Sequence, residues 1–187
     1  ASDAVILTDI GSSTLQGNDN GFFSLRYTQL RRIKILNKKG LEAADVSIIL
    51  HLADNSEEKL EECKAVTYNL ENGEVKQTKL ESSSIFKEKL SRYAAARKFT
   101  FPNVKEGSII EYTYTIVSPF LSSLRSWEFQ GTSWPRIYSE YTVKIPQFFS
   151  YVFLSQGYIQ LKPETQSKMQ TYSVSESNGT GASDRFS

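Results

Sequence analysis

The sequence contains one cysteine, one histidine and no long apolar run among its 187 residues. Cys63 therefore has no partner for a disulfide within the chain. A zinc site needs three or four Cys or His ligands, so His51 and Cys63 are too few. No stretch approaches the roughly 18 apolar residues that a membrane-spanning helix requires. The sequence thus predicts no metal site, no cofactor and no transmembrane segment.

The balance of charges is also nearly even, with a net charge of +1 at neutral pH. Proteins that bind nucleic acid usually carry a strong basic field, so the sequence gives no reason to expect that partner. The acidic residues Asp54, Glu57 and Glu58 cluster without the spacing that wraps a calcium ion. A solvated acidic loop is the expected structure there.

Residues that could carry out catalysis are sparse. Nucleophilic catalysis pairs Ser or Cys with a base, usually His. No Gly-rich turn accompanies His51 and Cys63, so we expect a strand histidine and an inert thiol. Three glutamates near aromatic strands leave a hydrolase with paired carboxylates as an alternative; they are Glu111, Glu128 and Glu140. The sequence otherwise predicts that this chain is not an enzyme and has no catalytic residue.

What the chain does contain favours β-strands, because ten Tyr and eleven Phe accompany many β-branched residues. Ile110, Tyr112 and Tyr114 alternate with polar residues and predict a strand over 108–117. An Asn72-Gly73 turn between two alternating runs predicts a hairpin. Serines at 82–84 predict a short helix near 82–90. Further strands are expected at 124–130, 137–145, 148–154 and 168–175. The predicted fold is all-β, an antiparallel β-sandwich with that one short helix.

No internal repeat or change of composition divides the chain, so residues 1–175 are expected to form a single β-sandwich domain. Residues 176–187 are rich in Gly, Ser and Asn, which is typical of a loop or a linker toward a downstream domain. A hairpin tip is an alternative for this segment. The first residues resemble a mature N-terminus, as expected after removal of a signal peptide.

Aromatic and arginine side chains gather between residues 125 and 138 and form the most plausible surface for a ligand or a neighbouring domain. They are Arg125, Trp127, Trp134, Arg136 and Tyr138. Ordinary sandwich core is the alternative for both tryptophans. It is favoured for Trp127, whereas Trp134 follows Gly131 in a predicted loop.

Several segments resemble, in the same order, the N-terminal β-domain of unknown function found in secreted bacterial proteins with transglutaminase-like domains. They read A-V-T-Y-N-L-E-N-G at 65–73, K-F-T-F-P-N-V-K-E-G-S-I-I-E-Y at 98–112, W-E-F-Q at 127–130 and Y-S-E-Y at 138–141. The resemblance implies export to the periplasm or cell surface. It also implies a downstream papain-like domain with a Cys-His-Asp triad, which nothing in this chain matches.

These observations lead to one main hypothesis and three alternatives. The main hypothesis is a non-catalytic accessory domain that docks onto a downstream transglutaminase-like or protease-like domain of the same polypeptide. The alternatives are a β-sandwich that binds glycans or peptides, the carboxylate hydrolase, and a saddle-shaped β domain like those that precede metallopeptidase cores.

Overall fold

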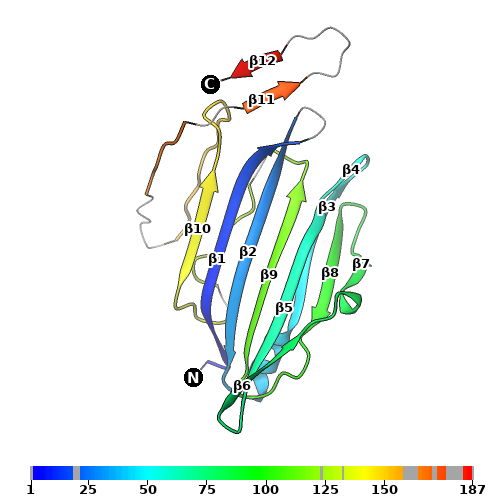
Figure 1. Cartoon of the computed structure of the whole chain (residues 1–187), viewed down its shortest axis with the longest axis vertical. Coiled ribbons are helices and arrows are strands. Elements are labelled where there is room, and N and C mark those ends of the chain that lie inside the picture. Colours follow the sequence, from blue (N-terminus) through cyan, green and yellow to red (C-terminus); the bar gives the residue numbers. More distant parts are fainter. Residues whose placement is uncertain are drawn as a thin grey trace.

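The computed structural model of the chain describes residues 2–18, 22–122, 124–131, 133–157, 164–169, 172–175 and 183–186 (Figure 1). Within these ranges the fold is all-β, as predicted. The strands are β1 (Ala4–Gly17), β2 (Phe23–Ile35), β3 (Asp45–Ala53), β4 (Ser56–Glu57), β5 (Lys59–Glu71), β6 (Glu74–Lys79), β7 (Phe86–Lys89), β8 (Ala94–Thr100), β9 (Ile109–Ser118), β10 (Ser139–Lys144), β11 (Tyr172–Ser175) and β12 (Ser183–Phe186). Two short 3-10 helices, η1 (Lys38–Ala44) and η2 (Ser82–Ser84), complete the described elements.

The strands form two facing sheets and a separate hairpin. The large sheet has the order β10-β1-β2-β9-β5-β6, the small sheet has the order β4-β3-β8-β7, and β11 pairs with β12. Every pair is antiparallel except β1 and β10, which run parallel from Asp9↔Ser139 to Thr14↔Lys144. This parallel pair at the sheet edge departs from the antiparallel pairing that the sequence predicts. The long connection after β9 explains the difference, because a parallel partner requires a crossover of a dozen or more residues.

Local turn chemistry decides the hairpin between β5 and β6, which confirms the prediction. Glu71 pairs with Glu74, and Asn72 and Gly73 both have positive φ, at 53° and 85°. Asn and Gly tolerate this left-handed conformation at low cost, and its twist matches that of the flanking strands.

The helix expected near 82–90 is confined to η2, and its second half is strand β7. Phe86 to Lys89 pair with Lys98 to Ala95 of β8, so sheet hydrogen bonds override the capping signal of the serines. Helix η1 begins after Asn37. There the Asn37 side chain accepts hydrogen bonds from the backbone N–H groups of Lys39 and Gly40, which stabilises the first helical turn.

Two of the later strand predictions are wrong. Residues 124–130 and 148–154 are not strands, because neither segment pairs with a strand in the described part of the chain. Strands β10 and β11 confirm the predictions within 137–145 and 168–175. The predicted loop or linker at 176–187 lies mostly outside the described residues, apart from β12. No helix among the described residues is long and apolar enough to cross a membrane.

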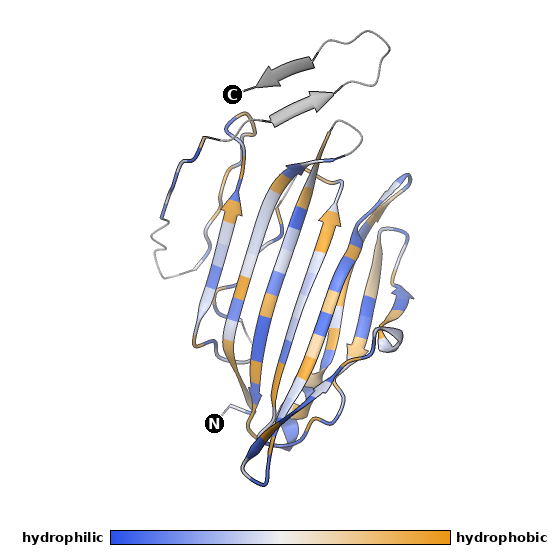
Figure 2. Cartoon of the chain, in the orientation of Figure 1, coloured by the Kyte–Doolittle hydropathy of each residue, from blue (hydrophilic) through white to orange (hydrophobic). Residues whose placement is uncertain are grey.

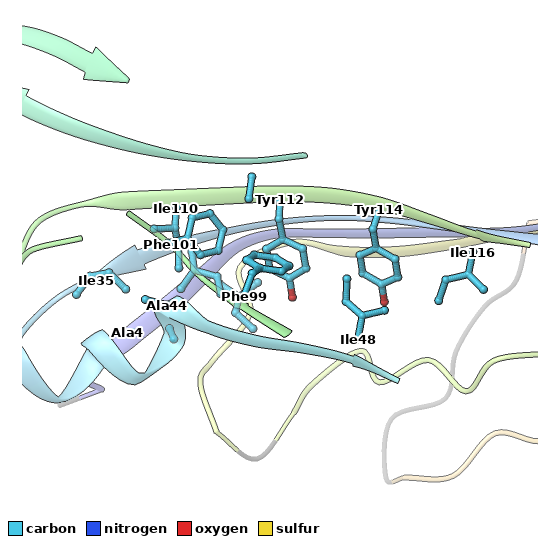
Figure 3. Packing of buried hydrophobic residues seen from close by; sticks show 14 of the residues in the cluster. Ala4, Ile35, Ala44, Ile48, Phe99, Phe101, Ile110, Tyr112, Tyr114 and Ile116 are labelled. Carbon is cyan, nitrogen blue, oxygen red and sulfur yellow. The ribbon is translucent and has the colours of Figure 1, made fainter. Parts of the chain in front are cut away.

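The core lies between the two sheets. The predicted inward face of β9 is confirmed, since Ile110 and Ile116 are fully buried there with Tyr112 and Tyr114. Ile48 of β3 and Phe99 of β8 meet this row from the small sheet, as Figure 3 shows. Hydrophobic and polar residues alternate along the strands of both sheets (Figure 2). This alternation leaves one apolar face on each sheet and so dictates a two-layer sandwich.

Candidate functional site

The connection between β9 and β10, residues 119–138, folds over the inward face of β1 and β2. Trp127 lies on Gly11 of β1, where an added Cβ would come within 2.3 Å of the ring atom Cζ3. The indole stacks on the Tyr141 ring, with 5.1 Å between the ring centroids and 6° between the ring planes. Its Nε1 donates a hydrogen bond to Ser139 Oγ at 3.1 Å. Only glycine at position 11 leaves room for this packing, so Gly11 and Trp127 fix the connection on the sheet.

A buried carboxylate, that of Asp9, also binds the connection to the sheet, through Arg136. Asp9 is 1% exposed, and its Oδ2 accepts from Arg31 Nη2 at 2.8 Å and from Arg136 Nε at 2.9 Å. Its Oδ1 accepts from Gln29 Nε2 at 2.6 Å. A buried charge is tolerated only when it is paired and hydrogen-bonded, and Asp9 meets both conditions.

Two buried tyrosines continue this polar network along the sheet. Gln29 Oε1 accepts hydrogen bonds from Tyr114 at 2.7 Å and from Tyr27 at 3.3 Å. Burial raises the pKa of Tyr114 to about 12 and also raises the pKa of Tyr27. Both hydroxyls therefore remain protonated at neutral pH and act as neutral hydrogen-bond donors.

A second ion pair joins the connection to the small sheet. Arg125 Nη2 donates to the carboxylate of Glu58, which is 5% exposed, and to the carbonyl of Ile49 at 3.0 Å. The guanidinium also lies 5.4 Å from the ring centroid of Tyr27. His51 Nδ1 lies 3.0 Å from the same carboxylate oxygen of Glu58. The connection thus bridges both sheets through charged side chains.

These groups surround an open cleft of about 720 Å³. Its floor holds the network of Asp9, and its walls include His51, Glu58 and the connection. Two of its three carboxylates, those of Asp9 and Glu58, are paired with arginine, which suits binding better than proton transfer. No serine or cysteine among the described residues hydrogen-bonds His51, so the imidazole has no nucleophile to activate there. The described residues also include no group of three His, Cys, Asp or Glu that could hold a metal.

The five residues predicted to form one surface lie in three different places. Arg125, Trp127 and Arg136 line the cleft and point toward the sheet. Trp134 packs half-buried against the core. Tyr138 is 49% exposed and bonds Glu140 outside the cleft.

Of the three glutamates considered for a hydrolase, only Glu128 lines the cleft. Glu111 pairs with Arg32 of the neighbouring strand, and Glu140 bonds the exposed Tyr138. Two catalytic carboxylates must flank one substrate bond. The structure does not bring these three glutamates together.

Sequence reasoning missed Asp9, Gln29 and Arg31, which complete the cleft with Glu58. The expectation of a solvated acidic loop is wrong for Glu58, which is 5% exposed because Arg125 pairs with it. Asp9 is the one charged residue of strand β1, where a charged side chain on the inward face indicates a paired buried group. Arg31 is on the inward face that Tyr27 also occupies, so strand alternation offered a signal for it.

Cys63 lies on β5 opposite Tyr114 of β9 and does not itself line the cleft, and its burial has a testable consequence. Burial raises the pKa of its thiol to about 11. Because the thiolate is the reactive form, we expect alkylation by iodoacetamide to be slow at pH 8 and to accelerate toward pH 11. Mass spectrometry over time measures the rate, with the urea-unfolded chain as the control. Equal rates for the folded and unfolded chains at pH 8 would contradict this expectation.

Comparison with known proteins adds a family to this geometry. Residues 23–181 match the family model described as "Domain of Unknown Function with solved-structure structure (DUF3857)". The chain belongs to this family. The expected membership in a family of β-domains of unknown function is thereby confirmed. No curated protein matches the sequence of this DUF3857 domain.

Among solved structures, the domain is similar to one described as the crystal structure of "a putative protease from Parabacteroides distasonis ATCC 8503". The identity is 12% and the TM-score is 0.48, over 70% of this chain and 25% of that chain. The DUF3857 domain thus spans about a quarter of that protein's length.

Proposed function

We propose that this DUF3857 domain is a non-catalytic accessory module of an exported transglutaminase-like or protease-like protein. It docks onto a downstream domain of the same polypeptide. The cleft supports the non-catalytic part, because its buried carboxylates serve as anchors for the connection. The strand segments resemble domains of secreted transglutaminase-like proteins, which supports both a transglutaminase-like neighbouring domain and export from the cytoplasm. Cell fractionation tests the export.

An exposed apolar segment after β10 carries the proposal of docking. Val152, Phe153 and Leu154 are consecutive and are 85%, 65% and 86% exposed. The same segment is attached to the sandwich. The Tyr151 hydroxyl donates to the carbonyl of Leu121 at 2.6 Å, and the ring of Phe149 packs on that of Phe23 with 5.3 Å between the ring centroids. Adjacent apolar side chains exposed from an anchored segment are typical of an interaction surface.

A neighbouring domain explains this arrangement in physical terms. Interfaces between domains of one chain combine apolar contacts with a polar rim. The anchors at Phe149 and Tyr151 hold the apolar side chains in place before contact, which reduces the entropy lost on docking. The three exposed side chains would then be buried against the partner domain.

The test replaces two exposed side chains by charges. We expect Val152→Asp with Leu154→Asp to leave the melting temperature of the domain nearly unchanged, since both side chains are more than four-fifths exposed. Binding to the downstream domain encoded by the same gene, measured by calorimetry, should weaken at least about tenfold, because buried aspartates would lose hydration.

The matched control is Leu70→Asp with Val75→Asp, two apolar residues of the β5–β6 hairpin that are 70% and 64% exposed. It should bind like the unmodified domain. Equal binding by all three proteins would contradict docking through this segment. A gene that encodes no transglutaminase-like or protease-like domain would refute the proposed parent protein.

A further inference from the structure

The cleft beneath the connection holds arginine side chains whose hydrogen-bonding capacity is only partly used. We propose that it binds an acidic peptide, whose carboxylates pair with the guanidinium groups of Arg31 and Arg125. This inference concerns a different surface from the docking segment and does not depend on it.

Free donors in the cleft are the first support. Arg125 bonds the described residues only through Nη2, which leaves its Nε and Nη1 available. Arg31 donates through Nη2 to Asp9 and also hydrogen-bonds the side chain of Tyr112, but its Nε is buried without a partner among the described residues. Both guanidinium groups are already held by their carboxylates, so a ligand would meet donors in fixed positions.

The charge of the cleft floor is the second support. Arg136 is 6% exposed at its side chain, shares Asp9 with Arg31, and keeps a buried Nη1 without a partner among the described residues. Two guanidinium groups on one carboxylate leave a surplus positive charge. A second carboxylate, brought by a ligand, would balance it.

The remaining charged groups do not reverse this preference. Glu58 is occupied by Arg125, with His51 beside it, and Asp9 is fully enclosed. Glu128, which is exposed, is the one cleft carboxylate that has no hydrogen bond or ion pair with a described residue. Its charge opposes an acidic ligand, so removing that charge should improve binding.

The shape and lining favour a peptide over a glycan. Glycans stack on free aromatic rings, but Trp127 is stacked on Tyr141 and lies against Gly11. The exposed ring of Tyr93, which also lines the cleft, is covered on one face by the guanidinium of Arg92, 4.3 Å from its centroid. The planar fork of a guanidinium matches a carboxylate through two parallel hydrogen bonds. Apolar side chains also line the cleft, namely Leu25, Leu52, Phe120 and Leu124. Its volume of about 720 Å³ accommodates a short peptide with apolar neighbours to the acidic residue.

The experiment uses two capped peptides, acetyl-Leu-Glu-Leu-Glu-amide and its glutamine analogue, titrated into the complete chain by calorimetry at low ionic strength. We expect the glutamate peptide to bind at least about tenfold more tightly than the analogue. A glutamine peptide with a free carboxyl terminus distinguishes recognition of a terminal carboxylate from recognition of acidic side chains. Equal affinities for all three peptides, or no binding up to about 1 mM, would overturn the proposal.

Two neighbouring arginines on opposite faces of β2 provide a matched pair of variants. Arg31 lines the cleft, whereas Arg32 pairs with Glu111 outside it. We expect Arg31→Gln to weaken glutamate-peptide binding about tenfold and Arg32→Gln to change it less than about twofold. Near-UV circular dichroism verifies the fold of each variant. Equal effects of the two variants would refute recognition by the cleft.

A variant at the exposed rim keeps the test decisive if Arg31→Gln does not fold. Glu128→Gln removes the opposing charge from an exposed side chain. It should tighten binding of the glutamate peptide about threefold and leave the glutamine peptide unaffected. Unchanged or weaker binding of the glutamate peptide would overturn the proposal.

Discussion

Asp9→Asn is expected to destabilise the domain by about 3–5 kcal/mol, the usual consequence of removing one member of a buried ion pair. The amide keeps the shape of the side chain but removes the charge that Arg31 and Arg136 share. The guanidinium of Arg136, whose side chain is 6% exposed, would then remain buried without a charge partner, and the partly buried Arg31 would lose its ion pair. For a domain of this size the loss corresponds to a fall of roughly 6–20 °C in melting temperature.

Thermal and urea unfolding followed by circular dichroism measure this effect. The control is Glu111→Gln, which breaks the pair with Arg32, whose side chain is 47% exposed. Solvent screens that pair, so its loss should cost less than about 1 kcal/mol. Similar losses for the two variants would mean that the charge of Asp9 does not hold the connection.

Gly11→Ala is expected to cost about 1–3 kcal/mol, although alanine normally suits a strand better than glycine. The new Cβ would lie 2.3 Å from Cζ3 of Trp127, so the indole must leave its stack on Tyr141. In a Trp127→Ala background the obstacle is gone. The same substitution should then stabilise the strand by about 0.5 kcal/mol, which reverses the sign of the effect.

A double-mutant cycle by urea unfolding measures this coupling. The control substitution is Gly17→Ala, since nothing lies within 4 Å of its added Cβ. Tryptophan fluorescence in a Trp134→Phe background reports the displacement of Trp127 directly. An equal cost of Gly11→Ala with and without the indole would contradict the proposed fit between Gly11 and Trp127.

Features governed by neighbouring residues were predictable from the sequence. The alternation in β9 and the Asn72-Gly73 turn depend on side-chain periodicity and backbone sterics, which act over a few residues. The prediction of a helix near 82–90 is wrong in its second half because a distant part of the chain decides the structure there. Its second half pairs with β8, and a distant strand decides the conformation of a weakly helical segment.

The cleft was predictable only in part, because its contacts join distant parts of the chain. Aromatic and arginine side chains drew attention to Arg125, Trp127 and Arg136, but their partners Glu58, Gly11 and Asp9 had no such signal. Asp9 and Arg136 are separated by 127 positions in the sequence. Strand periodicity also cannot distinguish a segment that pairs within a sheet from one that packs over its face, as residues 124–130 do. That outcome depends on room at a single glycine of another strand.

The parallel β1–β10 pair has a consequence for the order of folding. One edge of β1 meets β2, the next strand in the sequence, whereas its other edge meets residues 139–144. Such distant pairing is slow, because closing a long loop costs chain entropy before any contact compensates for it. A nascent chain thus carries β1 with an open edge until β10 emerges. During synthesis this open edge can pair with a second copy of the growing polypeptide.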